Sequence, residues 1–298
     1  MKWVEHTVAA EEAGQTVQEI LTGAMGVSRR MIQRLTRARG ILLNRRPAYL
    51  GRKVRAGDVV AARLAWAEEP GLAPVEMPLA IVHEDAELLV VDKPPSLLVH
   101  PLSPAHTRTL AHGIAHHFAA AGVHAKVRPV HRLDRDTSGL LLVAKTAFAH
   151  QHLDRQLRER TLTREYLALA RGVVEADAGA VDAPIGPHPR HPHLRAVRAD
   201  GEPALTRFRV VERFPDATLL RLELETGRTH QARVHLAHLG HPLLGDRQYG
   251  GGGAAPIDRQ ALHAVRLAFA HPATGERLAF EVSLPEDMAR AVEALRGG

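Results

Sequence analysis

Apolar residues near the N-terminus repeat with the spacing of a helix. Val27, Met31 and Leu35 are four residues apart, which places them on one helical face. Ser28 carries a side chain that caps helix N-termini, and Gly40 ends the pattern. The spacing therefore predicts a short amphipathic helix between these two residues.

Two short apolar runs follow this helix, at residues 41–44 and 54–60. A turn-rich segment separates them, as is typical of two neighbouring strands. Together the helix and the two runs predict a small α/β domain at the start of the chain.

Beyond residue 79 the pattern becomes rich in strands. Residues 88–91 form a continuous apolar run, and residues 220–225 alternate between leucine and charged side chains. Residues 267–282 are typical of a hairpin, and a closing helix is predicted after it, while helical spacing recurs at residues 149–157. Because strands outnumber helices and do not alternate regularly with them, we predict an α+β fold with a largely antiparallel mixed β-sheet.

A segment rich in proline and glutamate divides the chain. Residues 66–78 hold three prolines, one glycine and three glutamates, a composition typical of an interdomain linker. The length of 298 residues fits two domains at roughly 150 residues each. We therefore predict a small domain over residues 1–65, a linker over 66–78 and a larger domain over 79–298.

The composition excludes several kinds of chemistry. Cysteine is absent, which excludes disulfides, thiolate nucleophiles, iron–sulfur clusters and cysteine-type zinc sites. No apolar run approaches the roughly 18 residues that a membrane-spanning helix needs, and no secretory segment follows Met1. We expect a soluble cytoplasmic protein with no membrane role.

The formal net charge of +6 is concentrated in one segment. Residues 28–57 contain ten basic residues and no acidic one, whereas the rest of the chain holds 29 basic and 33 acidic residues, a net charge of −4. Such a segment is typical of a surface that binds nucleic-acid phosphates, and the alternative is a solvated charged face. The candidates for phosphate binding are Arg29, Arg30, Arg34, Arg37, Arg39, Arg45, Arg46, Arg52 and Lys53.

Three parts of this segment carry a resemblance. A Ser-Arg-Arg start of the helix at 28–30 precedes Gly-Ile-Leu-Leu-Asn at 40–44 and Val-Arg-Ala-Gly-Asp at 54–58. Over about residues 14–64 the chain resembles the alpha-L RNA-binding domain first described in a ribosomal small-subunit protein. The resemblance implies that the arginine face of the helix lies along RNA phosphates and contributes affinity without reading the base sequence.

A charged turn leads directly into an apolar strand at residues 130–145. Asp134 stands between Arg132 and Arg135, and neighbouring cations keep a carboxylate ionised near neutral pH. The following Thr-Ser-Gly at 137–139 supplies short hydrogen-bond donors and a flexible backbone for a tight turn. This pattern fits either a poised catalytic carboxylate or a solvent-exposed turn with local ion pairs.

Further motifs surround this turn in a fixed order. They are Val91-Asp-Lys-Pro-Pro95, Val99-His-Pro101, His131-Arg-Leu-Asp134 with Thr137-Ser-Gly139, Glu165-Tyr-Leu-Ala168, Val181-Asp-Ala-Pro-Ile-Gly186, Thr226-Gly-Arg-Thr-His-Gln-Ala-Arg-Val-His235, Gly240-His-Pro-Leu-Leu-Gly-Asp246 and Leu262-His-Ala264. With these motifs the chain resembles the RluA family of RNA pseudouridine synthases. The resemblance spans about residues 79–290 and implies an isomerase with the mixed, largely antiparallel sheet of that family.

Roles for individual residues follow from this resemblance alone. It implies that Asp134 is the catalytic carboxylate and that Arg233 forms a salt bridge which positions it. Tyr166 would stack against the target base, and Arg132 would help to extrude the uridine. The family needs no cofactor. Pro187 stands where the family often has an arginine, which leaves the exact RNA open.

Competing interpretations concern metals and catalysis. His112 and His116 have the spacing of two metal ligands on a helix, but Gly113 stands where a zinc-protease helix carries its glutamate. We therefore expect neither a metal nor a cofactor. The expected partner is RNA, with large-subunit ribosomal RNA favoured over transfer RNA, and the chain is expected to be a monomer. A non-catalytic RNA-binding or ribosome-assembly factor on the same fold is the second functional hypothesis.

Overall fold

The computed structural model describes residues 3–63, 68, 71–250, 252 and 255–297. Residues 3–63 form a four-stranded antiparallel sheet in the order β1-β4-β2-β3, with helices packed on it. Its elements are β1 (Val4–Thr7), the 3-10 turn η1 (Ala10–Glu12), α1 (Val17–Thr22), α2 (Arg29–Arg37), β2 (Ile41–Leu43), β3 (Arg46–Pro47) and β4 (Val59–Ala62).

The helix predicted near the N-terminus is α2, and its cap is the predicted one. The Ser28 hydroxyl accepts a hydrogen bond from the Met31 N–H at 3.3 Å. Met31 and Leu35 are buried in the core of the small domain, together with Ile20 of α1 and Val60 of β4. The spacing of the apolar residues thus decided which face of this helix is buried.

The strand predicted over residues 54–60 is wrong in its first half, because β4 begins only at Val59. Residues 55–58 form a turn in which the Asp58 N–H donates to the Arg55 carbonyl at 3.0 Å. The Asp58 carboxylate also accepts from the Arg55 N–H at 2.8 Å, and Gly57 adopts a φ of 83°. Local turn chemistry of glycine and aspartate therefore prevails over the strand propensity of Val54.

The remainder of the described chain is built on a ten-stranded sheet in the order β10-β13-β14-β9-β15-β8-β6-β5, with β16 paired to β15 and β7 paired to β8. Within the described residues β15 and β8 run parallel and the other pairs of this sheet are antiparallel. This confirms the predicted α+β fold.

The elements of this larger unit are β5 (Ala80–Glu84), β6 (Leu88–Lys93), α3 (Leu110–Ala120), β7 (Arg128–Pro129), β8 (Ser138–Ala144), α4 (Ala147–Arg158), β9 (Thr163–Arg171), β10 (Ala178–Asp182), β11 (Ile185–Pro187), β12 (Arg195–Val197), β13 (Leu205–Arg213), β14 (Ala217–Leu224), α5 (Gln231–His238), β15 (Leu262–Ala270), β16 (Arg277–Glu281) and α6 (Glu286–Arg296). β11 and β12 form a separate two-stranded ribbon. The predicted hairpin and closing helix are β15, β16 and α6.

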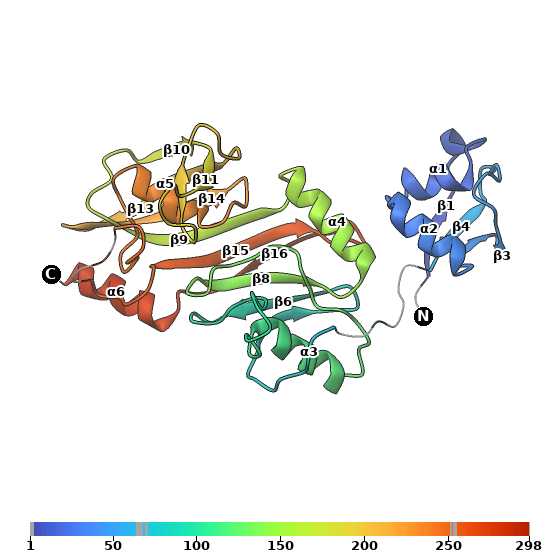
Figure 1. Cartoon of the computed structure of the whole chain (residues 1–298). Coiled ribbons are helices and arrows are strands. Elements are labelled where there is room, and N and C mark those ends of the chain that lie inside the picture. The colour runs from blue at the N-terminus through green and yellow to red at the C-terminus, as the bar shows by residue number, and fades with distance from the viewer. Residues whose placement is uncertain (1–2, 64–67, 69–70, 251, 253–254, 298) are drawn as a thin grey trace.

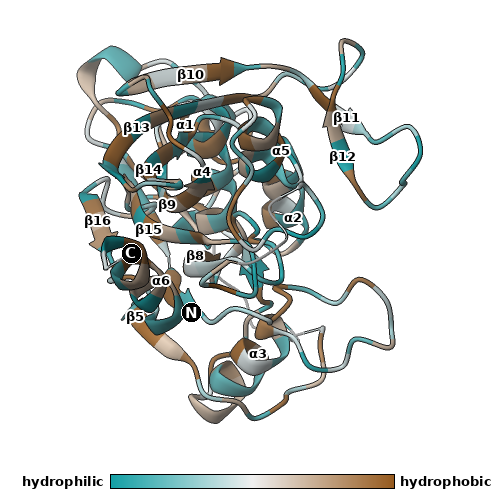
Figure 2. Cartoon of the chain, turned by 90° about the vertical axis from the view of Figure 1, so that its left-hand side faces the viewer, coloured by the Kyte–Doolittle hydropathy of each residue, from teal (hydrophilic) through white to brown (hydrophobic). Residues whose placement is uncertain are grey.

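Both faces of the large sheet are covered by helices. In β6, Leu89 and Val91 pack in the core that contains α3 and α5, whereas Leu88 and Val90 pack in the core that contains α4. Figure 2 shows α5 and α6 on opposite sides of the stacked strands. Burial on both sides explains why β6 and β8 are apolar at nearly every position.

The small domain contacts the larger unit at α4 (Figure 1). Phe148 of α4 joins the apolar core of the small domain. The Gln151 side chain accepts from the Ser28 N–H at 3.0 Å and donates to the Gly26 carbonyl. The start of α2 is thus fixed against α4, and the orientation of the α2 arginines depends on this contact.

Part of the predicted linker packs against the large domain. The Val75 N–H donates to the His112 carbonyl of α3 at 3.2 Å. Leu72 packs against the core that contains α3 and α5. Residues 66, 67, 69 and 70 lie outside the described residues. Among the helices that the structure describes, none is long and apolar enough to cross a membrane.

Candidate active site

A cleft of about 1810 Å³ lies between the loop that precedes β8, the start of α5 and the loop that follows α5. The four residues to which the sequence assigned catalytic roles, Arg132, Asp134, Tyr166 and Arg233, all line it. Pockets for small molecules are commonly ~300 to 1,000 Å³. The cleft is therefore large enough for a nucleotide that remains part of a longer strand.

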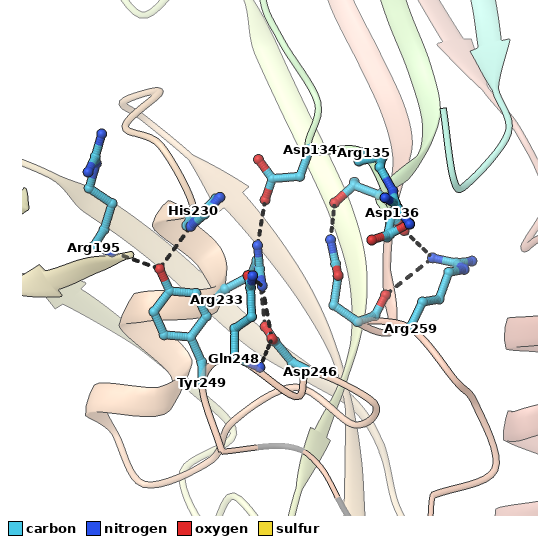
Figure 3. A network of polar contacts seen from close by, with 12 residues as sticks. Asp134, Arg135, Asp136, Arg195, His230, Arg233, Asp246, Gln248, Tyr249 and Arg259 are labelled. Atoms are coloured by element: carbon cyan, nitrogen blue, oxygen red, sulfur yellow. Dashed lines mark hydrogen bonds and ion pairs between the residues drawn. The ribbon is translucent and has the colours of Figure 1, made fainter. Parts of the chain in front are cut away.

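Asp134 lies in the loop between β7 and β8, opposite Arg233 of α5. Arg233 Nη1 and Asp134 Oδ2 are 3.3 Å apart (Figure 3). The arginine side chain is 5% exposed and the carboxylate 21%. A buried cation therefore holds a carboxylate that opens toward the cleft, and the fold brings together two residues that are 99 positions apart.

Arg233 has stronger partners than Asp134. Its Nε and Nη2 donate to the two carboxylate oxygens of Asp246 at 2.7 and 2.9 Å, and Nη2 also donates to Gln248 at 2.6 Å. The guanidinium lies over the ring of Tyr249, 4.8 Å from its centroid. Burial lowers the pKa of Arg233, but the bonds to Asp246 and the nearby charge of Asp134 outweigh burial and raise it. Arg233 is thus held in a fixed position by Asp246 while one N–H group faces Asp134.

Asp246, Gln248 and Tyr249 were not among the residues to which the sequence pattern assigned a role. The signal that pointed to Asp246 was its place at the end of the Gly240–Asp246 motif. Gly245 makes the geometry possible, because it has a φ of 73° and a Cβ there would lie 2.1 Å from the Arg259 carbonyl oxygen. A side chain at this position would push Asp246 away from Arg233.

Lys93 at the end of β6 supports the loop that carries Asp134. Its side chain is fully buried, and Nζ donates to the carbonyl oxygens of Pro94, Leu97 and Arg135 at 2.8, 2.9 and 2.9 Å. Burial lowers the pKa of Lys93 to about 7. Three carbonyl acceptors match the three N–H groups of the ammonium form. Lys93 therefore binds the backbone next to Asp134 to the end of β6.

Arg259 holds the same loop from the side of α6. Its Nε and Nη2 donate to Asp287 at 2.6 and 2.9 Å. Its Nη1 donates to the Asp136 carbonyl at 2.9 Å (Figure 3). The two residues directly after Asp134 are both bound through the backbone. Lys93 binds the backbone carbonyl of Arg135, and Arg259 binds that of Asp136. The loop that carries Asp134 is therefore held by side chains from two different segments of the chain.

Tyr166 and Arg132 lie in the cleft with different degrees of exposure. Tyr166 of β9 is 4% exposed and packs with the core on the α5 face, whereas Leu167 and Leu169 pack on the opposite face, as the strand alternation predicts. Burial raises the pKa of Tyr166, and the charge of Asp134 raises it further, whereas Arg164 lowers it. Because burial is the largest effect, the hydroxyl stays protonated. Arg132 is exposed at the cleft.

The basic residues of the small domain lie on two surfaces. Arg30, Arg34 and Arg37 of α2 line a groove of about 910 Å³ between α2 and the larger unit, whose far wall includes Lys126 and Arg128. A second set does not line this groove and lies on and after the β2–β3 hairpin; it comprises Arg45, Arg46, Arg52 and Lys53. Arg29 and Arg39 are exposed at the two ends of α2.

Glu68 neutralises part of the groove, which the sequence did not predict. Its carboxylate accepts from Arg34 at 3.2 Å and pairs with Arg128 across the groove. Burial raises the pKa of Glu68, but the bonds to Arg128 and Arg34 outweigh burial and lower it. The carboxylate therefore joins the two walls of the groove.

His112, one of the two histidines considered as metal ligands, has a structural role. The His112 ring is buried, and its Nδ1 lies 2.7 Å from the Thr109 hydroxyl at the start of α3. Within the described part of the chain, no group of three or more histidine, aspartate or glutamate side chains is arranged to hold a metal ion.

Residues 87–238 match the sequence model of the RNA pseudouridylate synthase family. The chain belongs to this family, and it is of the RluA type that its motifs indicated. It is 40% identical over 301 residues to YlyB of Bacillus subtilis, an RNA pseudouridine synthase described as uncharacterized, with 99% of both chains covered. It is 44% identical over 257 residues to ribosomal large subunit pseudouridine synthase D of Vibrio parahaemolyticus, which covers 82% of this chain and 79% of that one.

Solved structures agree with this assignment. The structure of human RNA pseudouridylate synthase domain containing 1 shares 27% identity with the chain and superposes with a TM-score of 0.57, over 74% of this chain and 96% of that one. The predicted enzyme class, an isomerase that forms pseudouridine in RNA, is thereby confirmed.

A buried histidine joins the start of β8 to β15 in this synthase. The Ser138 hydroxyl lies 3.0 Å from His263 Nδ1, and the two residues are partners in the parallel pair. Gly139 follows with a φ of 109°, and a Cβ there would lie 2.3 Å from the Ala264 carbonyl oxygen. This close approach fixes where the loop that carries Asp134 ends.

We expect His263 to make the fold sensitive to acid. Burial, with Arg259 nearby, lowers the pKa of His263 from 6.5 to about 4. The unfolded chain takes up a proton near pH 6.5 while the folded chain does not, so the contribution of His263 is lost as the pH falls toward 4. We expect the difference in unfolding free energy between wild type and His263→Asn to fall by about 1.4 kcal/mol per pH unit in this window.

Urea unfolding at steps between pH 7.5 and 4.5 measures this difference. His238→Asn is the control, because His238 is exposed at the end of α5, and its difference from wild type is expected to stay flat. A flat difference for His263→Asn as well would show that His263 is not held neutral.

Proposed function

We propose that this synthase isomerises uridines in large-subunit ribosomal RNA with Asp134 as its catalytic carboxylate. The observation that carries the proposal is the placement of Asp134 in the cleft beside the buried Arg233, whose position Asp246 fixes. The choice of RNA is supported by relatives named ribosomal large subunit pseudouridine synthase D. Transfer RNA is the alternative substrate.

The chemistry of pseudouridine formation needs an ionised carboxylate. The N1–C1′ bond of uridine breaks, the uracil turns, and C5 joins C1′, so that no atom is gained or lost overall. An ionised Asp134 would act either as a nucleophile at C1′ or as a base that removes the proton from C2′. The Arg233 guanidinium favours the ionised form in both routes, because it remains charged at any relevant pH.

The target nucleotide must leave its stack before the bond breaks. Extrusion of a base costs a few kcal/mol, which a pocket with aromatic walls offsets. We assign this role to Tyr166, because it is among the residues that line the cleft and lies close enough to Asp134 for that charge to act on it. Arg132 is exposed in the same cleft and would bind a phosphate of the extruded nucleotide.

We further propose that the groove beside α2 binds phosphates of the same RNA. Asp154 of α4 lines both the cleft and the groove, so the two cavities meet at this helix. Arg30, Arg34 and Arg37 would contact phosphates without reading bases. This assigns the small domain to affinity and the cleft to the choice of the uridine.

Asp134→Asn tests the catalytic role of this carboxylate. We expect this variant to bind RNA as the wild type does but to form no pseudouridine, because an amide is neither an adequate nucleophile nor a base. Asp136→Asn is the matched control, two residues away in the same loop, and is expected to retain activity within a few-fold. The measurement is a map of pseudouridines in total RNA from cells that contain the wild type, either variant, or no synthase.

The outcomes of this map are distinct. Sites in large-subunit ribosomal RNA that depend on Asp134 support the proposal. Sites confined to transfer RNA would overturn the choice of RNA while retaining the catalytic role. Undiminished modification by Asp134→Asn would overturn that role, and so would remove the basis for a carboxylate mechanism.

A triple substitution in α2 tests the role of the groove. Replacing Arg30, Arg34 and Arg37 together with glutamine should reduce the slope of log affinity against log salt by about two to three, because each phosphate contact contributes about one. Arg296→Gln is the control, since Arg296 lies on α6 and lines neither cavity. An unchanged slope in binding titrations from 50 to 300 mM salt would show that α2 does not contact the RNA.

A further inference from the structure

His230 occupies a strained position next to the catalytic pair. It is the residue before α5 and adopts a left-handed backbone conformation, with φ 59° and ψ 20°. For a residue other than glycine this conformation is uncommon and costs free energy, and such residues concentrate at functional sites. Two hydrogen bonds fix the turn that imposes this conformation. The Gln231 side-chain oxygen accepts from the Thr226 hydroxyl at 2.7 Å and from the Arg228 N–H.

The His230 ring is held by Tyr249. His230 Nδ1 lies 2.8 Å from the Tyr249 hydroxyl oxygen, and the same oxygen accepts from the backbone N–H of Arg195 at 2.9 Å. Figure 3 shows the Tyr249 hydroxyl between these two groups. The Tyr249 ring also lies under the guanidinium of Arg233, so one side chain contacts both the catalytic arginine and His230.

This arrangement determines where the protons lie. Burial raises the pKa of Tyr249, so its hydroxyl keeps its proton, and burial lowers the pKa of His230, so its ring is neutral. Among the described residues, the acceptor within reach of the Tyr249 proton is His230 Nδ1, because the Arg195 group is a donor. Tyr249 therefore donates to Nδ1, and the proton of the neutral ring is assigned to Nε2.

The Nε2–H group is left without a partner inside the protein. Neither hydrogen bonds nor ion pairs involve His230 Nε2 within the described residues, and Nε2 is not buried. His230 lines the same cleft as Asp134 and is close enough for the charge of Asp134 to act on it. A neutral donor with a fixed direction thus faces the cleft beside the catalytic carboxylate.

We propose that His230 Nε2–H donates a hydrogen bond to an oxygen of the target nucleotide, and that Tyr249 sets the tautomer which makes this possible. The proposal rests on the function given above. The acceptor is an oxygen of the RNA, either a uracil carbonyl or a phosphate oxygen. A neutral donor suits either one, because it binds the oxygen without neutralising the nearby Asp134 as a cation would.

Three variants separate the donor from the fold. His230→Asn tolerates the left-handed conformation and retains a group that bonds Tyr249, but it has no atom at the Nε2 position. His230→Gln restores a donor near that position. Tyr249→Phe keeps the ring under Arg233 but removes the hydroxyl that fixes the tautomer.

The test combines single-turnover kinetics and RNA binding with nitrogen-15 NMR of the histidine rings. The wild type is expected to show His230 with the proton on Nε2, the signal being assigned by its loss in His230→Asn, and Tyr249→Phe is expected to show a mixture of tautomers. His230→Asn should lose about tenfold or more in activity while its unfolding midpoint in urea remains unchanged, and His230→Gln should recover most of that loss.

The two possible acceptors give different kinetics. A uracil carbonyl predicts that His230→Asn lowers the rate constant for isomerisation with an unchanged Kd. A phosphate oxygen predicts a weaker Kd with a smaller salt dependence. The proposal is overturned if the proton of wild-type His230 is on Nδ1, or if His230→Asn matches the wild type in both rate and Kd. A wild type that is inactive on large-subunit ribosomal RNA would refute the proposed substrate, and the NMR result would stand independently.

Discussion

The active site depends on one buried guanidinium that two carboxylates share. Arg233 makes two bonds to Asp246, whose side chain is 1% exposed, and one longer contact to Asp134, whose side chain is 21% exposed. A buried arginine is costly unless a carboxylate compensates for its charge. Asp246 supplies that compensation and fixes the orientation of the guanidinium through Nε and Nη2. The Nη1 group then faces Asp134 at the longer distance of 3.3 Å. Asp134 thus has a fixed cationic partner while its carboxylate stays partly exposed toward the cleft.

The rest of the fold serves to bring these groups together. Asp134 lies in the loop that connects β7 and β8. Lys93 of β6 and Arg259 bind the backbone of this loop, and Asp287 of α6 holds Arg259 in place. The parallel pair of β8 with β15 sets where that loop ends. Because each support comes from a different element, the geometry of the cleft depends on the whole sheet being assembled.

The sequence predicted those features that repeat at a regular interval or act locally. The helix α2 and the β15–β16 hairpin follow from apolar spacing. The arginines that flank Asp134 fitted either a catalytic carboxylate or an exposed turn, and its proposed role came from the family resemblance. Lys93 and Asp246 were not predicted as supports, because their partners are reached only after distant strands have paired. The division of the basic residues between the α2 groove and the β2–β3 hairpin also follows from tertiary contacts, in particular the bond of Gln151 to Ser28.

Arg233→Lys tests most directly whether geometry or charge is what Arg233 contributes. Lysine retains the positive charge but has no planar fork, so it cannot bind both oxygens of Asp246 and still face Asp134. We expect the single-turnover rate constant for pseudouridine formation to fall by about 100-fold in the folded variant, with RNA affinity close to that of the wild type. The unfolding midpoint is expected to fall as well, because a buried ion pair is weakened. A variant whose rate constant lies within about twofold of the wild type would contradict the account, because a charge alone would then suffice.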